Sequence, residues 1–140
     1  MGQKVHPLGF RLGITQEHQS RWYAKRAMYP IFMVEDRFIR SYCHEKYAEA
    51  GLITIAISRQ VDHLHVGLEV ARPKVLVGSR GQDLEKVRQD LVKELLQFRQ
   101  KKWSAVQRAT TAELRLTLHV TKVENPHTSA TILAEDLAEQ

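Results

Sequence analysis

Two neighbouring stretches of strict apolar–polar alternation, residues 52–59 and 63–70, constrain the fold of this chain more than any other feature. Each stretch is apolar on one side only, which is typical of half-buried strands in an antiparallel pair. The connection between them, residues 60–62, is short enough to make hairpin-like pairing the default. A third run over residues 113–123 alternates in the same way. We therefore expect one three-stranded mixed sheet with helices packed on a single face.

Apolar residues at helical spacing occupy the segments around these strands. They predict a helix over residues 34–50 and a longer amphipathic helix in which apolar side chains from Leu84 to Phe98 share one face. A shorter helix precedes the long one, since Pro73 suits a first helical turn. A last helix is expected to run to about Ala138. The predicted fold class is therefore α+β.

A tetrad of two glycines around a serine and an arginine, Gly78-Ser79-Arg80-Gly81, lies between the short helix and the long one. Gly78 can end a helix at positive φ, and Gly81 can open the next helix while another backbone approaches closely. The free amides of that helix's first turn, its dipole and Arg80 together favour a phosphate ligand. The tetrad alone is also compatible with an ordinary helix–helix turn. Its setting is similar to that of the KH domain, in which such a loop clamps nucleic-acid backbone.

Basic residues are concentrated in two parts of the chain. The 140-residue chain has a net charge of +5 at pH 7, which favours an anionic partner. Residues 1–30 carry five Lys or Arg against one acidic residue, and residues 71–110 carry ten against four. The second part surrounds the glycine tetrad, which is where a phosphate-binding interpretation needs positive charge.

We predict RNA contacts from basic, aromatic and loop residues in these parts, because cations bind phosphates and rings stack on bases. Around the tetrad the predicted contacts are Arg72, Lys74, Gly78, Ser79, Arg80 and Gly81. In the variable connection over residues 97–112 they are Arg99, Lys101, Lys102, Trp103 and Arg108. In the N-terminal arm they are Lys4, His6, Arg11, Arg21, Trp22, Lys25 and Arg26. Two alternatives stay open: Trp22 and Tyr23 instead pin the arm to the domain, and residues 97–112 form a solvated basic loop.

The sequence predicts neither a catalytic centre nor a cofactor. Ser79 lacks the strand–turn–helix context of a hydrolase nucleophile. His63, His65 and His119 could be brought together on the sheet, but no cysteine pair completes a zinc site, so no metal is expected. The single cysteine, Cys43, lies on an apolar helical stripe and is expected to be a buried, inert thiol in a reducing compartment. No run approaches the length of a membrane-spanning helix, so no membrane partner is expected.

Several stretches resemble one protein family over nearly the whole chain. Residues 1–14 (MGQKVHPLGFRLGI) and 20–24 (SRWYA) closely resemble the opening of bacterial and plastid small-subunit ribosomal protein three. Residues 71–81 (ARPKVLVGSRG) resemble the KH loop of that family. Residues 124–127 (ENPH) and 132–135 (ILAE) resemble its plastid members.

This resemblance implies a type II KH domain followed by a second α/β domain. The expected organisation is an N-terminal arm (residues 1–33), the KH domain (34–124) and a helix (125–140) that leads toward the second domain. The chain stops before that domain, so it is expected to be a split product, a piece of a longer protein or a truncated form. A separate chain could then carry the second domain and would be a partner.

The resemblance also implies a function. The chain is expected to be a non-enzymatic structural constituent of the small ribosomal subunit, binding ribosomal RNA in the subunit head near the messenger RNA entry side. Expected partners are small-subunit ribosomal RNA, nearby messenger RNA and neighbouring head proteins. The expected location is the ribosome of the chloroplast stroma, with the bacterial cytoplasm as the alternative. A free KH-type regulator that binds single-stranded RNA and a protein-interaction domain with incidental basicity are the competing hypotheses.

Overall fold

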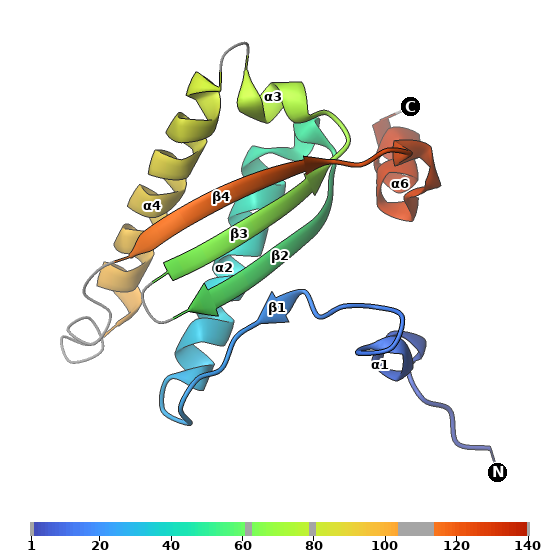
Figure 1. The fold of residues 1–140 in the computed structure, drawn as a ribbon, viewed down its shortest axis with the longest axis horizontal. Helices are drawn as coiled ribbons and strands as arrows, with labels where there is room; N and C mark the ends of the chain where they lie inside the picture. The colour runs from blue at the N-terminus through green and yellow to red at the C-terminus, as the bar shows by residue number, and fades with distance from the viewer. Residues whose placement is uncertain (1, 61–62, 79–80, 104–113, 140) are drawn as a thin grey trace.

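The computed structural model describes residues 2–60, 63–78, 81–103 and 114–139. These residues form a four-stranded sheet in the order β1-β2-β3-β4, with the long helices α2 and α4 on one side of it (Figure 1). The α+β class and the mixed sheet with helices on one face are confirmed. The sheet has one strand more than predicted.

Three strands coincide closely with the predicted ones. They are β2 (Leu52–Gln60), β3 (His63–Val70) and β4 (Arg115–Lys122). β2 and β3 pair antiparallel, and β4 pairs parallel to β3, so β4 forms one edge of the sheet. The apolar residues of β3 are all buried, as the alternation predicted.

The fourth strand, β1 (Ser20–Arg21), comes from the N-terminal arm and pairs parallel to β2 at the other edge. The backbone N–H of Ile57 donates to the carbonyl of Gln19 at 2.8 Å and secures this pairing. A two-residue strand is too short to produce an alternation pattern, which is why the sequence did not predict it.

A bulge near the start of β2 changes which of its residues face the core. The register shifts between Leu52 and Thr54. Leu52 and Ile55 are consequently both buried, while Ile53 is only partly covered. Alternation alone predicts that Ile53 shares the inner face with Ile55, but Ile53 is the extra, unpaired residue of the bulge and is less buried than Ile55.

The first long helix, α2 (Tyr29–Lys46), begins earlier than predicted, with a proline in its first turn. It ends at Lys46 rather than continuing to Ala50, and a short 3-10 turn, η1 (Ala48–Ala50), follows. Gly51 then adopts φ 64° and leads directly into β2.

Two further helices flank the glycine tetrad. They are α3 (Pro73–Val77) and α4 (Gln82–Lys102). α4 continues well into the segment predicted as a variable connection, so Arg99 and Lys102 are helical. Residues 104–113 of that segment lie outside the described residues.

The core lies between the sheet and the two long helices. It joins Ile39 of α2, Ile57 and Leu68 of the sheet, and Leu91 of α4, all almost fully buried. Cys43 is fully buried in the same cluster, and burial raises the pKa of its thiol to about 12. This environment fits the predicted inert thiol, since the reactive species is the thiolate.

The two ends of the chain are less embedded in this core. A short helix in the arm, α1 (Pro7–Arg11), buries no residue. At the other end, η2 (Pro126–Thr128) precedes α6 (Ala130–Glu139), whose Ile132 is buried. Within the described residues, none of the helices has both the length and the apolar character needed to cross a membrane.

Candidate nucleic-acid interface

The turn between α3 and α4 has the backbone geometry that the glycine tetrad predicted. Gly78 follows the last residue of α3 with φ 67°, and Gly81 stands at the N-cap of α4 with φ 75°. Positive φ is readily adopted only by glycine. The two residues between the glycines, Ser79 and Arg80, lie outside the described residues.

The side chain of Asp83 adds a second constraint at Gly78. A Cβ atom built on Gly78 would overlap the carboxylate of Asp83, whereas one built on Gly81 would meet nothing within 4 Å. Asp83 lies in the first turn of α4 and accepts a hydrogen bond from Lys86 at 2.9 Å. This hydrogen bond raises the pKa of Lys86. A negative charge therefore already lies beside the turn.

A groove of 280 Å³ begins at the same end of α4 and runs between that helix and the edge strand β4. Figure 1 shows α4 lying beside β4, with α3 at the end where the turn is. The lining residues come from one side of α4 and from the first half of β4: Leu84, Glu85, Arg88, Leu116, Thr117 and Leu118. The groove combines an apolar floor with charged and polar rims.

Arg88 lies across this groove, and sequence reasoning missed it. Its Nε donates to Glu85 at 2.9 Å, and its Nη1 reaches the carbonyl of Leu116 at 3.5 Å. The hydrogen bond to Glu85 raises the pKa of Arg88 and lowers that of Glu85. Only the packing of α4 against β4 singles out Arg88, because helical spacing alone places it among several exposed charges.

The other predicted contacts around the tetrad are surface residues. Arg72 and Lys74, at the start of α3, are exposed. Arg72 lies 3.8 Å from Asp136 of α6 in a loose ion pair. Arg72, Lys74 and the two glycines follow one another along α3 and the turn, and none of them lines the groove.

The predicted residues of the arm lie in a different place. Lys4, His6, Arg11, Arg21, Lys25 and Arg26 are exposed. Figure 1 shows the arm extending from the β1–β2 side of the sheet, away from α4 and the turn. Arg21 is ion-paired with Glu17. The arm and the groove are thus separate surfaces.

Trp22 anchors the end of the arm. Its indole ring packs at 5.3 Å from the ring of Tyr29 and 5.6 Å from that of Phe32. Its Nε1 donates to the carboxylate of Asp36. Of the two interpretations of this aromatic pair, anchoring describes Trp22, while Tyr23 is 90% exposed.

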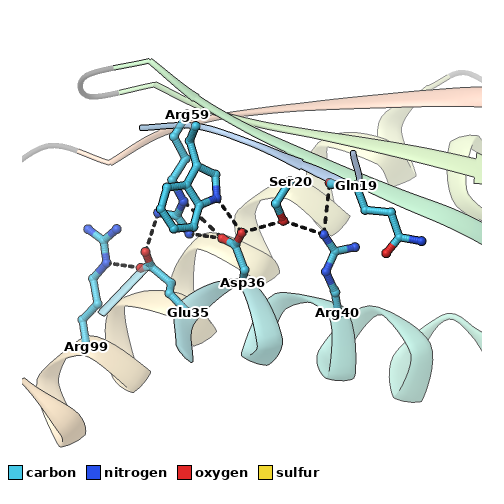
Figure 2. Close-up of polar contacts among 8 residues, drawn as sticks. Gln19, Ser20, Glu35, Asp36, Arg40, Arg59 and Arg99 are labelled. Carbon is cyan, nitrogen blue, oxygen red and sulfur yellow. Dashed lines mark hydrogen bonds and ion pairs between the residues drawn. The ribbon is translucent and has the colours of Figure 1, made fainter. Parts of the chain in front are cut away.

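Arg99 and Trp103, predicted as RNA contacts, are buried. Figure 2 shows Arg99 directed toward Glu35, to which its Nε donates at 2.5 Å. The guanidinium also lies 4.8 Å from the centre of the Trp103 ring. Both side chains stabilise the C-terminal end of α4. Lys101 and Lys102 are exposed beside them, and Arg108 lies outside the described residues.

Arg99 belongs to a buried polar network that joins four elements. Arg59 of β2 donates to Glu35 and to Asp36 of α2, each at 2.5 Å, and both carboxylates are almost fully buried. Asp36 also accepts from Ser20 of the arm at 2.9 Å, as Figure 2 shows. Arg40 lies one turn further along α2, and its guanidinium donates to the hydroxyl of Ser20 at 2.8 Å. The network fixes α2, α4, β2 and the end of the arm relative to one another.

The three histidines that were considered as zinc ligands lie on neighbouring strands. The rings of His63 and His65 stack at 6.0 Å on β3, and His119 lies on β4. Among the described residues there is no group of three or more side chains arranged to hold a metal ion.

Comparison with known proteins gives two results. The family model described as "KH domain" matches residues 39–128. The chain is also similar over its full length to curated proteins of about 40% identity. One is "Small ribosomal subunit protein uS3" of Prochlorococcus marinus (strain MIT 9303), 41% identical, of which the match covers 52%. Two are named "Small ribosomal subunit protein uS3c": that of Ostreococcus tauri, 39% identical with 59% covered, and that of Nephroselmis olivacea, 38% identical with 57% covered.

The match confirms the predicted resemblance to small-subunit ribosomal protein three. The whole of this chain aligns with each of these relatives, but it spans only 52% to 59% of their length.

Proposed function

The chain belongs to the KH domain family, and we propose that it is a structural constituent of the small ribosomal subunit that binds ribosomal RNA. The names of its full-length matches, uS3 and uS3c, support the ribosomal role. Such a role needs no catalytic residues, and we propose that the chain is not an enzyme.

The observation that carries the proposal is the geometry at the start of α4. Gly78 and Gly81, both at positive φ, flank the turn, and the groove between α4 and β4 opens beside it. Free amides at the start of α4 can donate to a phosphate, and the missing Cβ of Gly81 leaves room for a nucleic-acid backbone. This is the arrangement with which KH domains clamp four nucleotides.

Charged residues around the turn define the proposed contacts. Lys74 and Arg72 are exposed at the start of α3 and can reach phosphates of the same strand. Arg88 can bind a nucleotide in the groove once its contact with Glu85 rearranges. We retain Ser79 and Arg80 as proposed backbone contacts on the basis of the sequence.

The arm supplies a second proposed contact surface. Its exposed basic residues, among them Lys4, Arg11 and Arg26, lie away from the groove. We propose that they bind another segment of ribosomal RNA or a neighbouring protein of the subunit head. Lys101 and Lys102 remain proposed contacts at the exposed end of α4.

At a finer level, we propose that the chain lies in the head of the small subunit near the messenger RNA entry side. Its proposed partners are ribosomal RNA, nearby messenger RNA, neighbouring head proteins and a second domain, present in the same chain or carried by another. The relatives include chloroplast and cyanobacterial proteins. We therefore propose a ribosome of plastid or bacterial type.

Sucrose-gradient sedimentation of a lysate containing the tagged chain tests this proposal. We expect the chain to sediment with the small subunit and to remain there in moderate salt. A free RNA-binding regulator would stay near the top of the gradient, and that result would overturn the ribosomal role.

RNA binding at the turn is tested with the double variant Ser79→Asp plus Arg80→Asp. The matched control is Arg37→Asp plus Ser41→Asp, which makes the same change of charge on the exposed side of α2. We expect the first variant alone to lose affinity for a single-stranded tetranucleotide of RNA. Replacing Arg80 by Ala should reduce the salt slope of binding by about one. Equal loss from both double variants would show that only overall charge matters.

A further inference from the structure

The face of the sheet opposite α2 and α4 is exposed and follows a regular pattern. Register places Ser58, His65 and Thr117 in one row across β2, β3 and β4, and pairing of β1 adds Arg21 to the end of that row. In the next row, Gly67 lies between Ala56 and His119. In Figure 1 the sheet lies in front of α2, with this face free of helices.

A hollow of 320 Å³ lies on this face. Its floor is formed by the small residues Ala56 and Gly67, and its sides include His65, His119 and Arg21. A Cβ atom on Gly67 would only touch Ala56, at 3.7 Å, so close packing does not explain the glycine. The lack of a side chain at this position instead keeps the hollow open.

The chemistry of this face favours single-stranded RNA over a protein. Around the hollow, the open face carries small and polar side chains rather than the large apolar anchors that protein interfaces use: Ala56, Ser58, His65, Thr117 and His119. Ile53 is partly covered and lies at the bulge near the start of β2, outside the lining of the hollow. Imidazole rings can stack on bases, and hydroxyl groups can bond base edges. Arg21 at the edge of the hollow is ion-paired with Glu17, which also lines the hollow, so Arg21 can contact a phosphate only when this pair opens.

This hollow and the groove beside α4 lie on either side of the edge strand β4 and share one lining residue. Thr117 lines both of them, because it stands on the edge strand that separates the groove from the open face. A strand of RNA that leaves the groove over β4 at Thr117 therefore arrives at His119 and then at Gly67.

We propose that the open face of the sheet is a second RNA subsite, in which a nucleotide beyond those held in the groove lies over Gly67 and stacks on His65 or His119. The inference rests on the proposed RNA binding of the groove and extends it across the edge strand. The subsite takes an unpaired nucleotide, because only a base that is free of its neighbours in a helix can stack on a side-chain ring.

The binding of oligonucleotides of two lengths distinguishes this subsite from the groove. Fluorescence anisotropy would compare a single-stranded tetranucleotide with an octanucleotide of RNA on the full chain, since a KH loop clamps four nucleotides. Two variants disable the subsite: His65→Ala plus His119→Ala, which removes both rings, and Gly67→Val, which closes the hollow with a residue favoured in strands. The matched control, His44→Ala plus His127→Ala, removes two histidines elsewhere.

We expect both subsite variants to weaken octanucleotide binding by about fivefold or more, the low end of the loss expected from one stacked base. Tetranucleotide binding should be unchanged, and the control should bind both lengths normally. Unchanged octanucleotide affinity in the subsite variants would overturn the proposal, and so would an equal loss for both lengths.

The loop variant distinguishes failure of the subsite from failure of the groove. Ser79→Asp plus Arg80→Asp should weaken both lengths, and if it weakens neither, the proposed function of the groove is wrong. A further experiment examines subunits assembled with the Gly67→Val variant. If these subunits lose a protein and keep their RNA crosslink, a protein occupies the hollow. That outcome would also overturn the subsite.

Discussion

The indole Nε1 of Trp22 donates a 2.8 Å hydrogen bond to Oδ2 of Asp36, the same oxygen that accepts from Ser20. Arg59 donates to the other oxygen of this carboxylate. Two of the groups that satisfy a buried charge thus come from the arm. Residues 20–22 act as part of the folded domain, although the rest of the arm buries little.

Two deletions that differ by four residues test whether residues 20–22 belong to the folded domain while the rest of the arm does not. Removing residues 2–18 keeps the contacts of Ser20 and Trp22, so we expect the free energy of unfolding to change by less than about 0.5 kcal/mol. Removing residues 2–22 takes two donors from Asp36 and should destabilise the domain by about 1–3 kcal/mol. Urea denaturation followed by circular dichroism measures both. Equal stability of the two deletions would show that the arm contributes nothing.

Replacing Glu35 by Ala should destabilise the chain strongly. Glu35 is fully buried and accepts from both Arg59 and Arg99, so its removal takes a buried carboxylate from Arg99 and leaves Asp36 as the buried partner of Arg59. Breaking one side of a buried ion pair costs about 3–5 kcal/mol. Glu49→Ala, at an exposed carboxylate on η1, is the control and should be nearly neutral in urea denaturation. A small loss of stability in Glu35→Ala would mean that water enters the network and solvates the guanidinium groups.

The two glycines of the turn should respond differently to alanine. Gly81→Ala imposes only backbone strain at positive φ, about 1 kcal/mol. Gly78→Ala adds overlap with Asp83 and should destabilise more in thermal melting. Adding Asp83→Ala to Gly78→Ala should restore the additional loss of thermal stability. Adding Asp83→Ala to Gly81→Ala should restore no stability. Similar melting temperatures for both single variants would contradict the steric role assigned to Asp83.

Asp83→Asn should strengthen RNA binding. The carboxylate lies beside the turn and within the first turn of α4, where it repels a phosphate bound by the same amides. A single charge at a helix terminus contributes about 0.3–1 kcal/mol, so affinity for a single-stranded tetranucleotide should rise about two- to fivefold. Glu94→Asn, far along α4, provides a control of equal charge change. Unchanged affinity in Asp83→Asn would place the phosphate away from this turn.

Cys43 should react with thiol reagents only through unfolding. Burial raises the pKa of the thiol from 9.0 to about 12, so the folded chain holds almost no thiolate at pH 8. Labelling by dithiobis(nitrobenzoic acid), followed by absorbance, should proceed at the rate of opening and accelerate with urea. The folded pKa is the higher one, so this group lowers stability as pH rises from 9 toward 12 and has no effect at neutral pH. Rapid labelling of the native chain would refute this account.

Local patterns in the sequence were sufficient for the main strands and for the turn. Alternation located β3 within its observed bounds, because each of its residues faces either the core or the exposed side of one regular strand. The positive φ of Gly78 was predicted from its place at the end of a helix, whereas the positive φ of Gly81, at the start of the next helix, was not predicted. These features depend on neighbours in sequence.

Features that depend on distant pairing could not be predicted in this way. β1 exists because Gln19 accepts from Ile57, and nothing in residues 19–21 alone indicates a strand. Arg99 looked like an exposed charge in a basic segment, but Glu35, 64 positions earlier, holds it inside the fold. The groove and Arg88 likewise emerge only when α4 packs against β4.

The parallel pairing of β3 with β4 has a consequence for the order of folding. β2 and β3 can join through a short connection, whereas Leu116 reaches its partner Leu64 only after α3 and α4 have crossed the sheet. Closing such a long loop is entropically unfavourable before other contacts exist. We expect the β2–β3 hairpin to form first and β4 to dock last. The groove that we propose for RNA is therefore completed only in the final step of folding, so a nascent chain lacks this groove until β4 has been synthesised.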